Sequence, residues 1–145
     1  MSSWVPDELR RQVAERAEGI CEYCLIHERD THLGCELDHV VSEKHDGRTT
    51  SENLAYACFC CNRHKGSDVA SIEPESGELV RLFNPRTDLW SEHFRLQGGR
   101  IEWRTPIGEA TVRLLGFNLL ERILEREVLR AEGKYPSEAA RKRVR

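Results

Sequence analysis

Four of the six cysteines form two pairs in which two residues separate the members, Cys21 with Cys24 and Cys58 with Cys61. This spacing lets a tight turn aim both sulfurs at one ion, and four thiolates complete the tetrahedral coordination of Zn²⁺. The pattern predicts one zinc ion, which is structural because no position is left for a substrate. The alternative is four buried thiols that pack as small hydrophobic groups, the role expected for the remaining Cys35 and Cys60.

The polar residues that could do chemistry lie between and just after these pairs. Asp38 and His39 are adjacent in a stretch with strand character. Asn53 follows a polar loop, and Asn62 comes directly after the second cysteine pair. A neutral imidazole can accept a proton near pH 7, and carboxylate and amide oxygens suit a hard ion such as Mg²⁺. The ordinary alternatives are a strand histidine for His39, a turn asparagine for Asn53 and a helix N-cap for Asn62. Because these residues occur together beside two cysteine pairs, chance is a poor explanation of the pattern.

These residues resemble the HNH endonuclease family over residues 21–66. The family pattern is a C-x2-C knuckle, an Asp-His pair on a strand, a polar loop, Asn-Leu, and a second C-x2-C followed by His or Asn and a basic residue. The sequence matches it with Leu37-Asp38-His39, Asn53-Leu54 and Cys61-Asn62-Arg63-His64-Lys65-Gly66. The resemblance implies a ββα-metal fold, in which a two-stranded hairpin packs on a helix below a nucleic-acid cleft.

The resemblance also implies an activity, the hydrolysis of phosphodiester bonds in DNA that leaves 5′-phosphate and 3′-hydroxyl ends. By position in the family pattern, His39 is the general base, and Asp38 and Asn62 are ligands of a catalytic Mg²⁺ or Mn²⁺ ion separate from the zinc. Asn53 is implied to hold the loop and so orient the base. One rival interpretation is a zinc-stabilised nucleic-acid-binding or adaptor module that does not cleave, and a second is a zinc protein with no nucleic-acid role.

The candidates for phosphate contacts are the three residues that directly follow Asn62, namely Arg63, His64 and Lys65. A solvated helix face is the alternative for each of them. His64 is also a candidate for an extra metal ligand. The basic tail at residues 136–145 ends in a stretch, residues 141–145, that is a candidate for non-specific contact with DNA, and its alternative is a charged, solvated terminus.

The elements that must position these residues follow from propensity and turn signals. Residues 6–19 predict a helix with Pro6 in its first turn, and residues 33–41 predict a strand. A short helix is expected from residue 63 to about residue 70. Short strands are expected around two tight turns, at residues 71–73, 79–83 and 101–104.

The C-terminal third is predicted to be helical. One helix is expected over residues 109–115, and a second from Asn118 as its N-cap to about residue 131. The apolar stripe of the second helix is expected to face the core or a second copy of the chain. Its alternating charges, including Arg122 and Arg126, are expected to face solvent. The tail from residue 136 is expected to fray.

The length of 145 residues suits one domain of the α+β class. We expect a zinc and ββα core at about residues 19–70, a hairpin and helical extension at about 71–135, and the basic tail. No apolar run suggests a membrane span and no secretory signal is apparent, so a cytoplasmic location with reduced thiols is expected. The net charge of −3 does not favour general adhesion to DNA. We therefore expect a local DNA site, with a targeting protein or a homodimer as further candidates.

Overall fold

The structure is a computed structural model and describes residues 4–145. Residues 1–3, which entered the expectation about a secretory signal, lie outside this range. The helices are α1 (Asp7–Arg16), α2 (Phe59–Lys65), α3 (Trp90–His93), α4 (Pro106–Leu114), α5 (Leu120–Ala131) and α6 (Glu138–Val144). The strands are β1 (Cys35–His39), β2 (Leu54–Cys58), β3 (Ala70–Ile72), β4 (Leu79–Arg81), β5 (Phe94–Gln97) and β6 (Arg100–Trp103). Single turns of 3-10 helix are η1 (Glu28–Asp30), η2 (Glu43–His45) and η3 (Ser51–Asn53).

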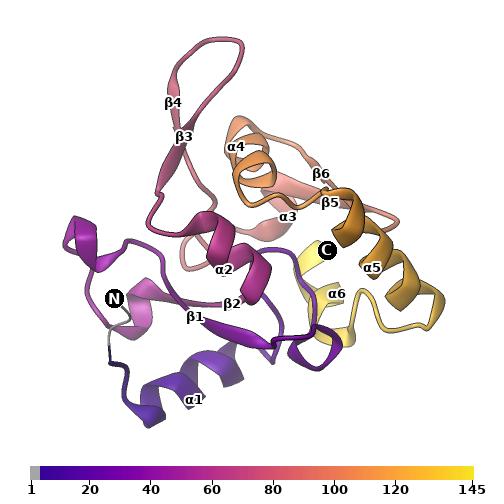
Figure 1. Ribbon diagram of the computed structural model, residues 1–145, viewed down its shortest axis with the longest axis horizontal. Coiled ribbons are helices and arrows are strands. Elements are labelled where there is room, and N and C mark those ends of the chain that lie inside the picture. Colours follow the sequence, from indigo (N-terminus) through magenta and orange to yellow (C-terminus); the bar gives the residue numbers. More distant parts are fainter. Residues whose placement is uncertain (1–3) are drawn as a thin grey trace.

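The centre of the molecule is an antiparallel hairpin of β1 and β2 that continues directly into α2 (Figure 1). In its register Asp38 lies opposite Ala55, and His39 lies opposite Leu54 at the end of β1. Helix α2 packs against both strands. The predicted α+β class with a ββα-metal motif is confirmed.

Helix α2 differs from its prediction in where it begins and ends. It starts at Phe59, because the Cys58 sulfur accepts the backbone N–H of Cys61 at 3.4 Å and so caps the first turn. It ends at Lys65, and Gly66 then has a positive φ of 53°. The predicted helix at residues 63–70 is therefore wrong, because the second cysteine pair itself forms the start of the helix.

The N-terminal helix α1 is confirmed and packs on β2. A small hydrophobic cluster joins the two elements and contains Val5, Val13, Ala17, Leu54 and Tyr56. The Arg16 guanidinium also donates to the carbonyl oxygen of Leu54 at 2.6 Å. These contacts fix α1 beside the hairpin.

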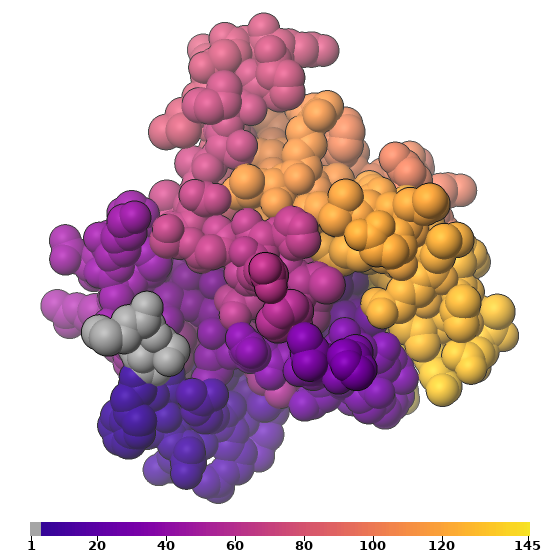
Figure 2. Space-filling view, in the orientation of Figure 1, coloured from indigo at the N-terminus to yellow at the C-terminus, as the bar shows by residue number. Residues whose placement is uncertain are grey.

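The segment after α2 forms two further antiparallel hairpins, β3–β4 and β5–β6. The strands predicted around the two turns are confirmed, and β5 is an addition. Hairpin β3–β4 projects from one end of the molecule (Figures 1 and 2). In the space-filling view the orange and yellow C-terminal segments lie against the magenta α2 region (Figure 2).

Helix α5 differs from the prediction at two arginines and along part of its apolar stripe, of which Leu129 is buried. Arg122 and Arg126 are buried, whereas Leu120, Leu124 and Val128 are exposed. The reason is that the arginines find buried acceptors, which for Arg126 are the carbonyl oxygens of Gly99 at 2.7 Å and Phe117 at 2.5 Å. A buried guanidinium with such partners is stable, so charge alternation alone did not identify the outer face.

Asn118 does not cap α5, as the sequence predicted. Its side chain pairs instead with the backbone of Ile101, accepting the N–H at 3.0 Å and donating to the carbonyl oxygen at 2.8 Å. The N-cap position is taken by Leu119, which makes no side-chain cap. Asn118 therefore joins the start of α5 to β6.

The C-terminal tail is helical rather than frayed. Ala140 of α6 is completely buried, and Lys142 and Arg143 lie 3.0 Å from Glu18 and 3.5 Å from Glu22. The predicted fraying is wrong because α6 packs on α3 and β5. These ion pairs turn part of the basic tail towards the protein.

The first cysteine pair is enclosed by the C-terminal extension. The Trp90 indole donates to the Tyr23 carbonyl oxygen at 2.8 Å, and the Tyr135 hydroxyl donates to the Cys24 carbonyl oxygen at 2.8 Å. One hydrophobic cluster accordingly runs from Ile20 to Ala140. Among residues 4–145 no helix has the length and apolar character needed to cross a membrane.

Candidate active site and zinc site

The two cysteine pairs meet in one buried cluster. The sulfurs of Cys21, Cys24, Cys58 and Cys61 all lie within 4.8 Å of one another. Zinc–sulfur bonds of about 2.3 Å in a tetrahedron place the sulfurs about 3.8 Å apart. The Cys24 and Cys58 sulfurs are 3.7 Å apart. The predicted ligand set therefore comes together in one place, where four sulfurs can surround one ion.

The surroundings of the cluster also fit a metal. Burial raises the pKa of the Cys21 and Cys61 thiols, so a cation is needed to hold them as thiolates. Backbone N–H groups of Cys24 and Cys61 donate to the first sulfur of each pair at 3.4 Å. Cys35 and Cys60 stay outside the cluster and pack at the edge of the core, as predicted.

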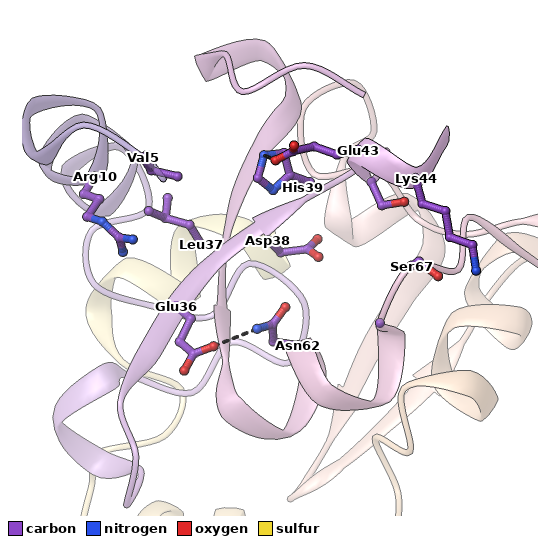
Figure 3. A pocket seen from close by; sticks show the side chains of 12 residues that line it. Val5, Arg10, Glu36, Leu37, Asp38, His39, Glu43, Lys44, Asn62 and Ser67 are labelled. Carbon is purple, nitrogen blue, oxygen red and sulfur yellow. Dashed lines mark hydrogen bonds and ion pairs between the residues drawn. The ribbon is translucent and has the colours of Figure 1, made fainter. Parts of the chain in front are cut away.

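A pocket of about 760 Å³ opens beside β1 and α2. Three predicted site residues line it together, namely Asp38 and His39 from β1 and Asn62 from α2 (Figure 3). Other residues from α1, β1 and η2 complete the walls, and those with charged side chains are Arg10, Glu36, Glu43 and Lys44. The pocket therefore combines a carboxylate, an imidazole and an amide that come from two adjacent elements.

Asp38 is held firmly on both oxygens. Its Oδ1 accepts from the Lys65 ammonium at 3.2 Å, and its Oδ2 accepts from the Tyr23 hydroxyl at 2.6 Å. Burial raises the pKa of the Asp38 carboxyl, while Lys65 and Tyr23 act in the opposite direction. Each carboxylate oxygen has a further lone pair, so Asp38 can bind a metal while these partners orient it.

Lys65 is a structural residue and not the predicted phosphate contact. Its side chain is buried, and its ammonium donates to Asp38 and to the carbonyl oxygens of His39 at 3.1 Å and Val40 at 3.2 Å. An ammonium with these three acceptors is not available at the surface. It fixes Asp38 and the end of β1 instead.

The other two predicted phosphate contacts are exposed but lie outside the pocket lining. The guanidinium of Arg63 lies over the Phe59 ring, 5.8 Å from its centroid. The Nδ1 atom of His64 is 2.8 Å from the Cys60 carbonyl oxygen, one helical turn earlier. Arg63 and His64 therefore do not form part of the wall that Asp38 and Asn62 line.

The His39 ring has two polar neighbours at Nε2. Its Nε2 lies 2.9 Å from the Thr49 hydroxyl and 3.6 Å from a Glu43 carboxylate oxygen. We assign the proton to Nε2 on this geometry, because both neighbours can accept it. Nδ1 then keeps its lone pair, and within residues 4–145 it makes no hydrogen bond.

Asn53 holds the loop that follows β1. Its Oδ1 accepts the Val41 N–H at 2.9 Å, and its Nδ2 donates to the carbonyl oxygens of Val41 and Arg48, both at 2.8 Å. The loop carries Thr49 and Glu43, the two partners of His39. These bonds are what the predicted orienting role of Asn53 requires.

Asn62 lies inside α2 and is not its N-cap, because Cys58 has that position. Its Nδ2 donates to the Glu36 carboxylate at 2.8 Å. Sequence reasoning missed Glu36, although its position two residues before Asp38 places both on one face of β1. It also missed Tyr23 and Glu43, which no local spacing relates to the site.

Comparison with known proteins decides the family of this region. Residues 21–68 match the family model described as HNH endonuclease. The chain contains an HNH domain. The match covers both cysteine pairs, β1, β2 and α2, and α1 and the C-terminal extension lie outside it. No curated protein and no solved structure matches the chain. The match to this family model indicates a nuclease family and a nucleic acid as the substrate.

Proposed function

We propose that this protein is a metal-dependent HNH endonuclease that hydrolyses phosphodiester bonds in DNA. The observation that carries the proposal is that Asp38, His39 and Asn62 line one open pocket within the HNH domain. The four-cysteine cluster is proposed to hold a structural zinc ion, which has no open coordination position for a phosphate oxygen. In this proposal the zinc ion has a structural role and a second divalent ion in the pocket has the catalytic role.

The residues of the pocket divide the chemistry between them. Asp38 and Asn62 would hold a Mg²⁺ or Mn²⁺ ion, which supplies charge stabilisation at the phosphate and the leaving 3′ oxygen. His39 takes a proton from the attacking water at Nδ1, and Glu43 offsets the charge that develops on the ring. Asn53 keeps the loop, and therefore Thr49 and Glu43, in place. The products are a 5′-phosphate and a 3′-hydroxyl.

The direct test is incubation of supercoiled plasmid with the purified protein. We expect nicked and linear DNA in the presence of Mg²⁺ or Mn²⁺, none after mild treatment with EDTA, and restored cleavage when the divalent ion is added back. Zinc analysis of the same sample should show that the structural zinc is retained. DNA binding without cleavage under all these conditions would refute the nuclease proposal and favour the non-cleaving binding module.

Two exposed cations on the pocket walls are proposed to contact the DNA backbone in place of Lys65. Arg10 of α1 and Lys44 of η2 lie on either side of the pocket (Figure 3). Within residues 4–145 neither side chain forms an ion pair or a hydrogen bond, so both can meet phosphates. With a divalent ion bound, the pocket becomes net positive despite Glu36 and Glu43.

Arg10→Ala is expected to weaken DNA binding and to lower the slope of log K against log salt by about one, the effect of losing one phosphate contact. Arg11→Ala is the matched control, because Arg11 is the exposed neighbour on α1 and does not line the pocket. Fluorescence anisotropy with a duplex at several salt concentrations measures both. Equal slopes for the two variants would contradict the placement of DNA beside Arg10.

A further inference from the structure

The amide of Asn62 has a defined orientation although it lies at the surface of the pocket. Its nitrogen is turned towards Glu36, to which it donates at 2.8 Å, and its oxygen is turned towards Asp38 (Figure 3). Within residues 4–145 the oxygen makes no hydrogen bond, so it remains available as a ligand. Glu36 and Asp38 stand on the same face of β1, one on each side of this amide.

The orientation matters because the two ends of an amide differ chemically. The oxygen can bind a hard cation, whereas the NH₂ group can only donate hydrogen bonds. Rotation of the amide by half a turn would present the wrong end to the ion. A carboxylate accepts hydrogen bonds and cannot donate them, so Glu36 binds only the NH₂ end.

We propose that Glu36 is a positioning residue that keeps the Asn62 oxygen directed at the catalytic ion. This inference rests on the proposed function, since it concerns the ion held by Asp38 and Asn62. Glu36 acts through Asn62 and need not touch the ion. It extends the site by one acidic residue that lies two positions before Asp38.

The test measures Mn²⁺ binding to the zinc-loaded protein by isothermal titration, together with the Mg²⁺ concentration that gives half-maximal cleavage. Glu36→Ala is expected to weaken both about tenfold, the usual effect of losing an outer partner of a metal ligand, with a near-normal rate at saturating Mg²⁺. Glu36→Gln should stay close to wild type, because its amide oxygen accepts the same N–H. Glu132→Ala serves as a control for the loss of one exposed acid.

Two results would overturn the role of Glu36. One is an unchanged metal affinity in Glu36→Ala. The other is an equal loss in Glu36→Ala and Glu36→Gln, which would mean that the charge of Glu36 acts on the ion directly. If the wild type binds Mn²⁺ but cleaves no DNA, the proposed function fails, while the titration still decides the role of Glu36.

A second inference comes from a different place, the buried arginine beside the cysteine cluster. The Nη2 atom of Arg122 lies 3.1 Å from the Cys61 sulfur and 3.8 Å from the Cys58 sulfur, and Nη1 donates to the Leu115 carbonyl oxygen at 2.7 Å. The residue is 6% exposed. It belongs to α5, outside the matched HNH region.

The charge of the cluster explains this burial. Four thiolates around one Zn²⁺ leave a net charge of −2, and a buried charge is unfavourable unless it is paired. A guanidinium that donates to two of the sulfurs offsets half of that charge.

We infer that Arg122 is part of the zinc site as an outer partner of Cys58 and Cys61, and that it raises the affinity for zinc. Outer partners of metal ligands typically change affinity by about 10–100-fold. Helix α5 and the zinc-binding pairs are therefore linked energetically. This inference does not depend on nuclease activity.

Helix α5 offers a matched control in Arg126, which is also buried and donates to the backbone carbonyl oxygens of Gly99 and Phe117 but to no sulfur. Competition with a chromophoric chelator should give a zinc dissociation constant about 10–100-fold higher in Arg122→Met and unchanged in Arg126→Met. Equal dissociation constants in the two variants would overturn the inference. If Arg122→Met does not fold, Arg122→Gln removes the charge but keeps a polar side chain, and zinc affinity equal to wild type in that variant would overturn the inference as well.

Discussion

His39→Ala is expected to lower the rate of plasmid cleavage by about 10²–10⁴-fold, the usual effect of removing a general base. The imidazole lines the pocket beside Asp38, and we assign its proton to Nε2, which faces Thr49 and Glu43. Alanine removes the imidazole that takes the proton from water in the proposed mechanism. Initial rates of nicking at saturating Mg²⁺ measure the effect.

The His39 variant should keep its fold and its zinc. The side chain is 15% exposed and makes no contact with the cysteine cluster, so circular dichroism and zinc content should match wild type. His64→Ala is the control, since His64 is exposed on α2 and does not line the pocket. Near-normal cleavage by His39→Ala, with a loss in His64→Ala, would assign the base to His64 and reject the alignment of the motif.

The zinc cluster and strand β1 could be predicted from sequence because their information is local, whereas β2 followed only from the family resemblance. Two residues between Cys21 and Cys24 fix a tight turn wherever they occur, and the alternation around Asp38 fixes a strand. The family pattern then singled out His39, which ends β1, and Asn62, which lies within α2, and both line the pocket. The sequence therefore identified the four cysteines of the cluster and the candidate base and ligands of the pocket.

The surroundings of these groups could not be predicted, because their partners come from distant segments. Lys65 was expected at the surface, but its ammonium is drawn inward by Asp38 and by two carbonyl oxygens at the end of β1. Arg122 was expected in solvent, but its acceptors include the sulfur of Cys61. In both cases the charge of the side chain suggested exposure to solvent, but acceptors from distant segments allow the side chain to be buried.

Cys24→Ser is expected to abolish tight zinc binding and to unfold the HNH domain and the extension together. Structural zinc contributes about 10–16 kcal/mol in small zinc domains, which equals or exceeds the total stability of about 5–15 kcal/mol of a typical domain. Here the cluster joins the first knuckle to the start of α2, and the Tyr135 hydroxyl binds the Cys24 carbonyl oxygen at 2.8 Å. Elemental analysis and thermal unfolding measure the two losses, and wild type should contain about one zinc per chain.

Cys35→Ser is the matched control for the loss of a thiol. Cys35 lies on β1, is half-buried and stands outside the cluster, so this variant should keep its zinc and most of its stability. Mild EDTA should stop cleavage by this control without unfolding it, because the catalytic ion is held by few oxygen ligands and the zinc by four buried sulfurs. A Cys24→Ser protein that melts like Cys35→Ser, or a wild type without zinc, would show that the four thiols are packing residues and that the hydrophobic cluster alone holds this fold.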